Sequence, residues 1–219
     1  MQAKVHLVTS PVSCYEVSMK ILGGTYLNER DLTDRGIKSV GRRVLVHETV
    51  NLVDLDSIEI GSDVRIDPFC ILSAAGGYLS IGNYVHIAAH VCIFAGAGVT
   101  LEDFCGLSHG VKVYSTSDDY SGAHLTNPTV PKEYLGIIAK PVALGRHVIV
   151  GSGSVVLPGA SIGEGTAVGA LSLVTKPLEP WGIYSGSPAR RIKARRKDLL
   201  ASEERLAASG RTRSENLEF

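Results

Sequence analysis

The chain has 219 residues, which fits one domain with room for a buried core. Its 22 lysines and arginines balance 22 aspartates and glutamates, so no net charge favours binding to nucleic acid or anionic lipid. Met1 to Ser10 lack the pattern of a signal peptide, and no apolar stretch approaches the roughly 18 residues that span a bilayer. We therefore expect a cytoplasmic protein.

A short helix is the first predicted element. The segment from Asn28 to Asp31, directly before Leu32, has the residue types of a helix start, and Gly36 marks the helix end. We expect residues 1–39 to form an N-terminal extension that carries this helix.

An aliphatic residue then returns every six positions. The early runs are Ile60, Ile66 and Leu72, then Ile81, Ile87 and Ile93, then Leu101, Leu107 and Val113. The later run is Leu144, Val150, Val156, Ile162, Val168 and Val174. Glycine often follows the aliphatic residue, and a small or β-branched residue comes four positions after it. These coupled constraints indicate a structural repeat.

A period of six fits neither a helix nor a lone strand, but it suits a short strand followed by a tight corner. Three such units close a triangular coil, and coils stack in parallel about 4.8 Å apart. The coil register pairs Ile87 with Leu107. Slips in phase between Leu72 and Ile81, and between Ile93 and Leu101, indicate bulged corners.

The four cysteines contain no CxxC pair, so neither a disulfide framework nor a zinc ribbon is indicated. They are Cys14, Cys70, Cys92 and Cys105. Cys70 and Cys105 occupy the small-residue position of the repeat, so we expect packed interior side chains without a reactive role.

The repeat is interrupted between Tyr114 and Pro141. A loop of this length inside a compact repeat domain is usually functional or disordered. Aromatic and aliphatic residues favour an ordered loop that covers something: Tyr120, Tyr134, Leu135, Ile137 and Ile138.

After the last repeat, the chain from Ser172 to Lys193 reads SLVTKPLEPWGIYSGSPARRIK. Apolar residues at mostly helical spacing predict a C-terminal helix from Ala189 to Ala208, and Arg211 to Phe219 form a loose tail. A basic run favours either a solvated helix face or an edge that contacts phosphate. It consists of Arg190, Arg191, Lys193, Arg195, Arg196 and Lys197.

The repeats resemble those of the hexapeptide-repeat acyltransferases, whose fold is a left-handed parallel β-helix. The exit segment is similar to that of the sugar and galactoside O-acetyltransferase branch, and small O-antigen acetyltransferases share the likeness. The resemblance covers roughly Val40 to Lys197. It implies an all-β fold, with a left-handed β-helix at residues 40–188, a loop insertion at 114–141, and a C-terminal helix and tail at 189–219.

The resemblance also implies acetyl-CoA as cosubstrate, no metal, and a homotrimer whose active sites lie between subunits. Ser152 and Ala170 match corner residues beside the thiol arm, and Lys176 and Arg190 match basic residues that meet the coenzyme phosphates. Lys176 could instead simply face water. Trp181 could cover the adenine or pack the final coil.

Galactoside-type relatives carry a catalytic histidine just inside the loop, and alignment by coils places Asp118 there, followed by Asp119. An aspartate is a weak base for a sugar hydroxyl, but a sugar amine is already partly nucleophilic near neutral pH. An aspartate in place of the relatives' histidine therefore favours an amino-sugar acceptor. The alternative is that Asp118 and Asp119 merely cap a loop turn.

Three histidines at outward positions are rival bases: His86, His90 and His109. His109 is the preferred one, because its coil runs directly into the loop. Each could equally be a solvated or trimer-packing residue.

The leading hypothesis is transfer of an acetyl group from acetyl-CoA to the amino group of a nucleotide-linked amino sugar for surface polysaccharide. The alternatives are O-acetylation of a sugar hydroxyl with a histidine base, a zinc enzyme of the γ-carbonic-anhydrase type using His86, His90 and His109, and a non-catalytic β-helix.

Overall fold

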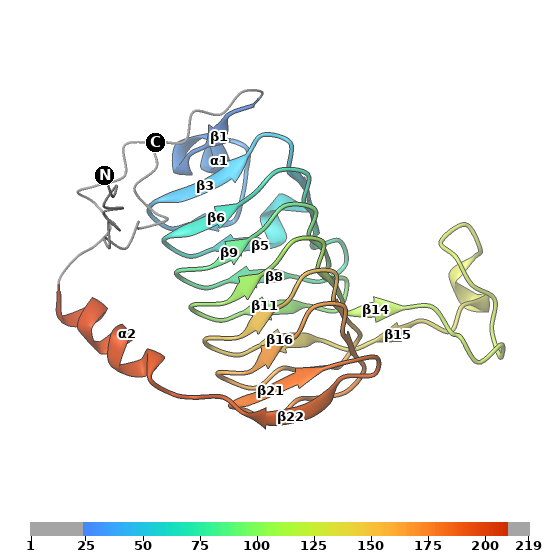
Figure 1. Cartoon of the computed structure of the whole chain (residues 1–219). Helices are drawn as coiled ribbons and strands as arrows, with labels where there is room; N and C mark the ends of the chain where they lie inside the picture. Colours follow the sequence, from blue (N-terminus) through green and yellow to red (C-terminus); the bar gives the residue numbers. More distant parts are fainter. Residues whose placement is uncertain (1–23, 210–219) are drawn as a thin grey trace, which may run out of the picture.

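The computed structural model describes residues 24–209, which form a column of stacked triangular coils (Figure 1). The expectations for Met1 to Ser10, for Cys14 and for Arg211 to Phe219 lie outside this range. Each coil passes in turn through a five-stranded, a nine-stranded and a six-stranded sheet, and the strands of neighbouring coils pair in parallel. The predicted β-helix is therefore confirmed.

The strands have these bounds. The nine-stranded sheet contains β1 (Tyr26–Leu27), β3 (Val44–His47), β6 (Val64–Ile66), β9 (His86–Ile87), β12 (Gly106–Leu107), β17 (Ile149–Val150), β19 (Ala167–Val168), β21 (Gly182–Ser185) and β22 (Arg190–Ala194). The six-stranded sheet contains β4 (Asn51–Val53), β7 (Ile71–Ser73), β10 (Cys92–Phe94), β13 (Lys112–Tyr114), β18 (Val155–Val156) and β20 (Leu173–Val174). The five-stranded sheet contains β2 (Ser39–Val40), β5 (Ile58–Ile60), β8 (Leu79–Ile81), β11 (Val99–Leu101) and β16 (Val142–Leu144).

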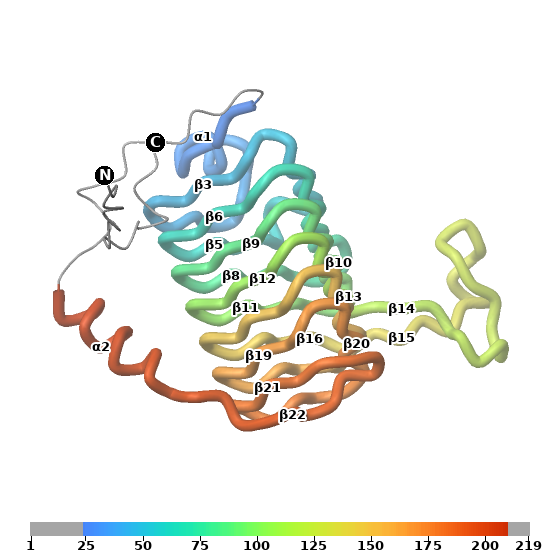
Figure 2. Tube along the Cα trace, in the orientation of Figure 1, coloured from blue at the N-terminus to red at the C-terminus, as the bar shows by residue number. Residues whose placement is uncertain are grey.

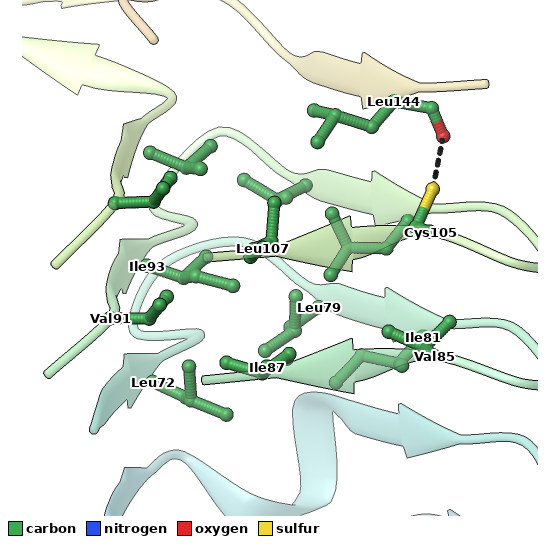
Figure 3. Packing of buried hydrophobic residues seen from close by; sticks show 14 of the residues in the cluster. Leu72, Leu79, Ile81, Val85, Ile87, Val91, Ile93, Cys105, Leu107 and Leu144 are labelled. Atoms are coloured by element: carbon green, nitrogen blue, oxygen red, sulfur yellow. Dashed lines mark hydrogen bonds between the residues drawn. The ribbon is translucent and has the colours of Figure 1, made fainter. Parts of the chain in front are cut away.

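The six-residue repeat fills the interior of the column. Every aliphatic residue of the later run is at most 3% exposed, and Ile87 pairs with Leu107 as the register predicts. Figure 3 shows side chains from neighbouring coils, Leu72, Ile93 and Leu107 among them, converging inside the column. This shared apolar axis is what stacks the coils in one register.

Cys70 and Cys105 are buried, as expected. The Cys70 thiol donates to the Ala88 carbonyl at 3.1 Å, and the Cys105 thiol donates to the Gly145 carbonyl at 3.3 Å. Burial raises the pKa of Cys70 to about 11 and that of Cys105 to about 12. Both therefore stay protonated thiols, which are poor nucleophiles.

The helix α1 (Glu29–Asp34) closes the N-terminal end of the column. The Asn28 side chain accepts from the amides of Arg30 and Asp31, and the Asp31 carboxylate accepts from the Asn28 amide at 3.0 Å. This reciprocal capping explains why the helix starts where the sequence predicts. Leu32, on the inner face of this helix, is fully buried.

The C-terminal helix α2 (Leu199–Ala208) begins ten residues later than expected. The prediction of helix from Ala189 onward is wrong for Arg190–Ala194, which form β22 and pair antiparallel with β21. The last coil otherwise leaves a strand edge with unpaired backbone groups, and β22 satisfies them. Glu203 then ties α2 to Arg146 and His147.

The loop leaves the column as an arm, here defined as residues 116–139. It starts and ends in the antiparallel pair β14 (Thr116–Ser117) and β15 (Ile138–Ala139), and it contains a single 3₁₀ turn at Lys132–Tyr134. Figure 2 shows it extending away from the coils, on the side opposite α2. Tyr120 is 92% exposed and Tyr134 is 58% exposed, so these rings have little cover within residues 24–209.

No helix in the described range is long and apolar enough to cross a bilayer.

The buried axis yields a stability prediction. Leu107→Ala removes a side chain that is 1% exposed, and it should lower the free energy of unfolding by about 2–5 kcal/mol in urea denaturation. The control is Thr100→Ala on the outer surface of β11, which should change stability by less than about 0.5 kcal/mol. Equal effects of the two substitutions would contradict the burial pattern.

Candidate active site

The coils turn from the nine-stranded to the six-stranded sheet at a ridge that we call the first corner. Five of the coils each place one residue with positive φ there: Phe69, His90, Gly110, Gly153 and Leu171. The residues just before them are Pro68, Ala89, His109, Ser152 and Ala170. Stacking of the coils therefore brings His109, Ser152 and Ala170 into successive layers about 4.8 Å apart.

Backbone hydrogen bonds hold these layers together. The amide of Gly153 donates to the His109 carbonyl at 2.9 Å, and the amide of Leu171 donates to the Ser152 carbonyl at 2.9 Å. Within residues 24–209, the amides of His109, Ser152 and Ala170 donate no hydrogen bond. A row of free N–H donors thus follows the ridge. The Ser108 side chain, directly before His109, is half-buried beside this row.

His86 lies on the outer surface of the nine-stranded sheet, where its ring is 46% exposed. Its Nε2 is 2.8 Å from the Asp67 carboxylate, which also accepts a hydrogen bond from the Tyr26 hydroxyl at 2.9 Å. Burial alone would raise the pKa of Asp67, but the His86 hydrogen bond and the Arg65 charge lower it to about 2. Burial and the bond to Asp67 raise the pKa of Tyr26 to about 12. These contacts fix the position of His86.

His90 is exposed at the first corner and stacks on Phe69, with ring centroids 5.3 Å apart. His109 is exposed one coil further along. The structure does not gather His86, His90 and His109 around one point, and the described residues contain no cluster of three or more His, Cys, Asp or Glu placed to hold a metal.

The two aspartates in the arm have different surroundings. Asp119 accepts from the Ser121 amide at 2.7 Å and from the backbone and ring nitrogens of His124 at 3.1 and 2.9 Å. The bonds from Ser121 and His124 hold the pKa of Asp119 well below its usual range. Among the described residues, the Asp118 carboxylate has no hydrogen bond or ion pair. Of these two aspartates, only Asp118 has a carboxylate without a partner among the described residues.

The expected phosphate contacts lie toward the C-terminal end of the column. Lys176 is exposed just after β20, and Arg190 is exposed at the start of β22. Trp181 has the Lys197 ammonium 4.9 Å from its ring centroid. Lys176, Arg190 and Lys197 therefore place positive charges near the last coils.

The candidates form two groups in one chain. His109 lies at the first corner, and Asp118 lies beyond the opposite end of β13, where the six-stranded sheet meets the five-stranded sheet. The three residues of β13 and the turns on either side of it lie between the two. Two grooves of about 330 Å³ lie elsewhere, one beside α2 and one near α1, and neither is lined by a candidate.

Sequence reasoning missed Asp67 and Ser108 as site neighbours. Both directly follow an inward residue of the repeat, Ile66 and Leu107. The six-residue register could have found them, because polar residues at that position stand in the same row at the edge of the nine-stranded sheet.

Comparison with known proteins gives the family. The chain is 42% identical over 178 residues to the dTDP-4-amino-4,6-dideoxy-D-glucose acyltransferase of Escherichia coli, covering 81% of this chain and 93% of that protein. The chain belongs to the hexapeptide-repeat acyltransferases. The coils of this acyltransferase therefore have the left-handed sense of its relatives. No family model matches the chain.

Solved structures of AntD, an N-acyltransferase from Bacillus cereus, resemble this chain over most of its length. The complex with dTDP and 3-hydroxybutyryl-CoA has a TM-score of 0.82 at 39% identity, covering 85% of this chain and 98% of that chain. A serine-to-alanine variant bound to dTDP-4-amino-4,6-dideoxyglucose and coenzyme A has a TM-score of 0.82 at 39% identity, covering 85% and 100%.

The lowered pKa of Asp67 yields a prediction about pH. Its carboxylate stabilises the fold above the unfolded-state pKa of 3.8, and this contribution is lost as the pH falls from about 4 through about 2. Asp67→Asn should therefore lower the free energy of unfolding by about 2 kcal/mol at pH 7 and progressively less toward pH 2. Urea denaturation across pH measures this.

The control is Asp198→Asn, whose exposed carboxylate pairs with an exposed arginine, Arg196. This substitution should change stability little at either pH. A pH-independent loss in Asp67→Asn would show that packing, and not the charge, is responsible.

Proposed function

We propose that the protein transfers an acetyl group from acetyl-CoA to the amino group of a dTDP-linked 4-amino-4,6-dideoxy sugar. The observation that carries this is the 42% identity to an acyltransferase of that sugar, over nearly the whole of the relative. The AntD complexes with the same nucleotide sugar, or with dTDP and an acyl-CoA, support both substrates.

The donor fits the first corner. A pantetheine arm is a slender chain of amide groups, and the free N–H donors of His109, Ser152 and Ala170 offer it hydrogen bonds along the ridge. One of these donors, with the Ser108 hydroxyl, can meet the oxyanion that forms when the thioester is attacked. Lys176 and Arg190 supply cations for the phosphates of coenzyme A.

The acceptor chemistry fits Asp118. A sugar amine attacks the thioester carbonyl as the neutral base, forms an amide and expels the coenzyme A thiolate, which takes up a proton. The free carboxylate of Asp118 can hold the ammonium form and accept the proton that the amine loses. Asp119 is unsuited to this, since its oxygens already bind the arm.

Two copies must share each site. We infer a homotrimer in which the arm of one copy brings Asp118 to the first corner of its neighbour, because the two groups lie at opposite ends of β13 within one chain. The AntD structures include variants at one serine and, ten positions further along, at one aspartate. In this chain, Ser108 and Asp118 are also ten positions apart. Ser108 lies at the first corner, and Asp118 lies in the arm.

Exposed side chains of the arm support this assembly. Tyr120, Tyr134 and Ile137 stand away from their own coils, and burying them against a second copy would remove apolar surface from water. We propose that the enzyme acts in the cytoplasm and that its product is used for surface polysaccharide.

The substrate assignment is tested with two acceptors that differ in one non-hydrogen atom, nitrogen or oxygen at C4 of the sugar. The enzyme should acetylate dTDP-4-amino-4,6-dideoxyglucose and leave dTDP-6-deoxyglucose unchanged, measured as thiol release and by mass spectrometry of the product. Substituting 3-hydroxybutyryl-CoA for acetyl-CoA tests the length of the acyl group. Faster reaction of the hydroxyl sugar would instead support O-acetylation with His109 as base.

The shared site is tested by co-expression of two impaired variants. Ser108→Ala and Asp118→Asn should each reduce kcat by about 100-fold or more, because the first removes an oxyanion donor and the second removes the proton acceptor. In mixed trimers of these two, about a quarter of the sites combine two intact groups, so activity should recover toward that fraction. The control is the Ser108→Ala/Asp118→Asn double variant, whose trimers contain neither intact group. Activity of the mixture no higher than that of the double variant would contradict the shared site.

A further inference from the structure

Two exposed aromatic rings occupy the first corner on the N-terminal side of His109. Phe69 is 58% exposed and stacks on His90 at an interplanar angle of 16°. In the next coil, the equivalent position is Gly110, and a Cβ placed there would have nothing within 4 Å. The ridge therefore presents a flat ring pair that ends in open space.

The aromatic stack at the corner between the five-stranded and nine-stranded sheets has a structural explanation that this pair lacks. At that corner the ring centroids of Tyr84 and Phe104 are 4.8 Å apart, and the Arg146 guanidinium lies 4.9 Å from the Phe104 centroid. His147 continues that stack and is held by Glu203 of α2. Phe69 has no such cover within residues 24–209.

A lysine reaches the same place. The Lys112 ammonium donates to the Gly110 carbonyl at 3.3 Å, so this side chain of β13 bends back to the first corner. An ammonium has three N–H donors, and this is its one hydrogen bond to the described residues. A positive charge with free donors thus lies one coil beyond His90.

We propose that Phe69, His90 and Lys112 form the nucleotide subsite for the acceptor, an assignment that rests on the proposed function. The base stacks on the Phe69–His90 pair, and Lys112 contacts the diphosphate. Stacking on an aromatic face suits a nucleobase, and an ammonium suits a phosphate.

The order of groups along the ridge supports the assignment. Ser152, Ala170 and the cations proposed for coenzyme A lie on the C-terminal side of His109, so the acceptor must approach from the other side. Phe69 is two coils from His109, about 10 Å along the column. A sugar joined to a nucleoside through a diphosphate spans such a distance, which places its amine near His109 when its base meets Phe69.

The test separates KM from kcat. Phe69→Ala and His90→Ala should each raise the KM for the dTDP-linked sugar by roughly 5- to 150-fold, the range for loss of one base-stacking contact. The KM for acetyl-CoA should not follow, and Phe69→Trp should restore the acceptor KM. Lys112→Gln should raise the acceptor KM and weaken its dependence on salt.

Two controls isolate the base. The same 4-amino sugar as its 1-phosphate, without a nucleoside, should show no comparable rise in KM with Phe69→Ala. Tyr84→Ala, in the stack on the opposite corner, should leave the acceptor KM at its wild-type value. An equal rise for the base-free sugar, an unchanged KM for the nucleotide sugar, or dissociation of the Phe69→Ala oligomer would each overturn the subsite.

Failure of the proposed function would look different. If the wild-type enzyme acylates no nucleotide-linked amino sugar, that function is wrong. Calorimetry with dTDP alone then decides the subsite: binding to wild type that weakens in both Phe69→Ala and Lys112→Gln supports it, and absence of binding overturns it.

Discussion

The stacking of coils in one fixed register is the constraint on which every other feature depends. Each coil is too short to bury its own apolar residues, and the strands of one coil find backbone partners only in the next. Ile87 lies over Leu107, which lies beside Val150. The arm interrupts the coils without shifting their register, because the Lys140 amide, just after the arm, donates to the Ser115 carbonyl just before it at 2.9 Å. Residues on either side of the arm therefore become neighbours at the first corner.

The same constraint drives the chemistry to the outside. Aliphatic side chains fill the interior, so polar groups can stand only on the flat faces and the corners. A convex column offers a substrate a ridge but no enclosing wall. Corners nevertheless supply something that faces do not, because the turn frees the amides of His109, Ser152 and Ala170 from the sheet ladders. In the proposed assembly, the arm of a second copy of the chain would supply the missing wall.

Features that depend on local sequence could be predicted. The inward positions, the coil register and the burial of Cys70 and Cys105 follow from a period of six. The start of α1 follows from residues within one helical turn. Features that depend on a neighbouring coil could not be read in the same way. The edge left by β21 recruits Arg190–Ala194 as a strand despite a helical pattern. Asp118 and Asp119 look equivalent in sequence, and only the fold of the arm around Ser121 and His124 removes Asp119 from the site.

A parallel column has two distinct ends, and this polarity can order two substrates along one ridge. The proposed donor contacts run from His109 toward the C-terminal coils, where the repeated corner position holds Gly153 and then the aliphatic Leu171. The proposed acceptor contacts run the other way, where Phe69 and His90 replace glycine with flat rings. Because neighbouring layers are about 4.8 Å apart, a coil added at one end of the column would lengthen the binding surface for one substrate and leave the surface for the other unchanged. The side chain at a single repeated corner position would then decide whether that layer holds a thin chain or a planar base.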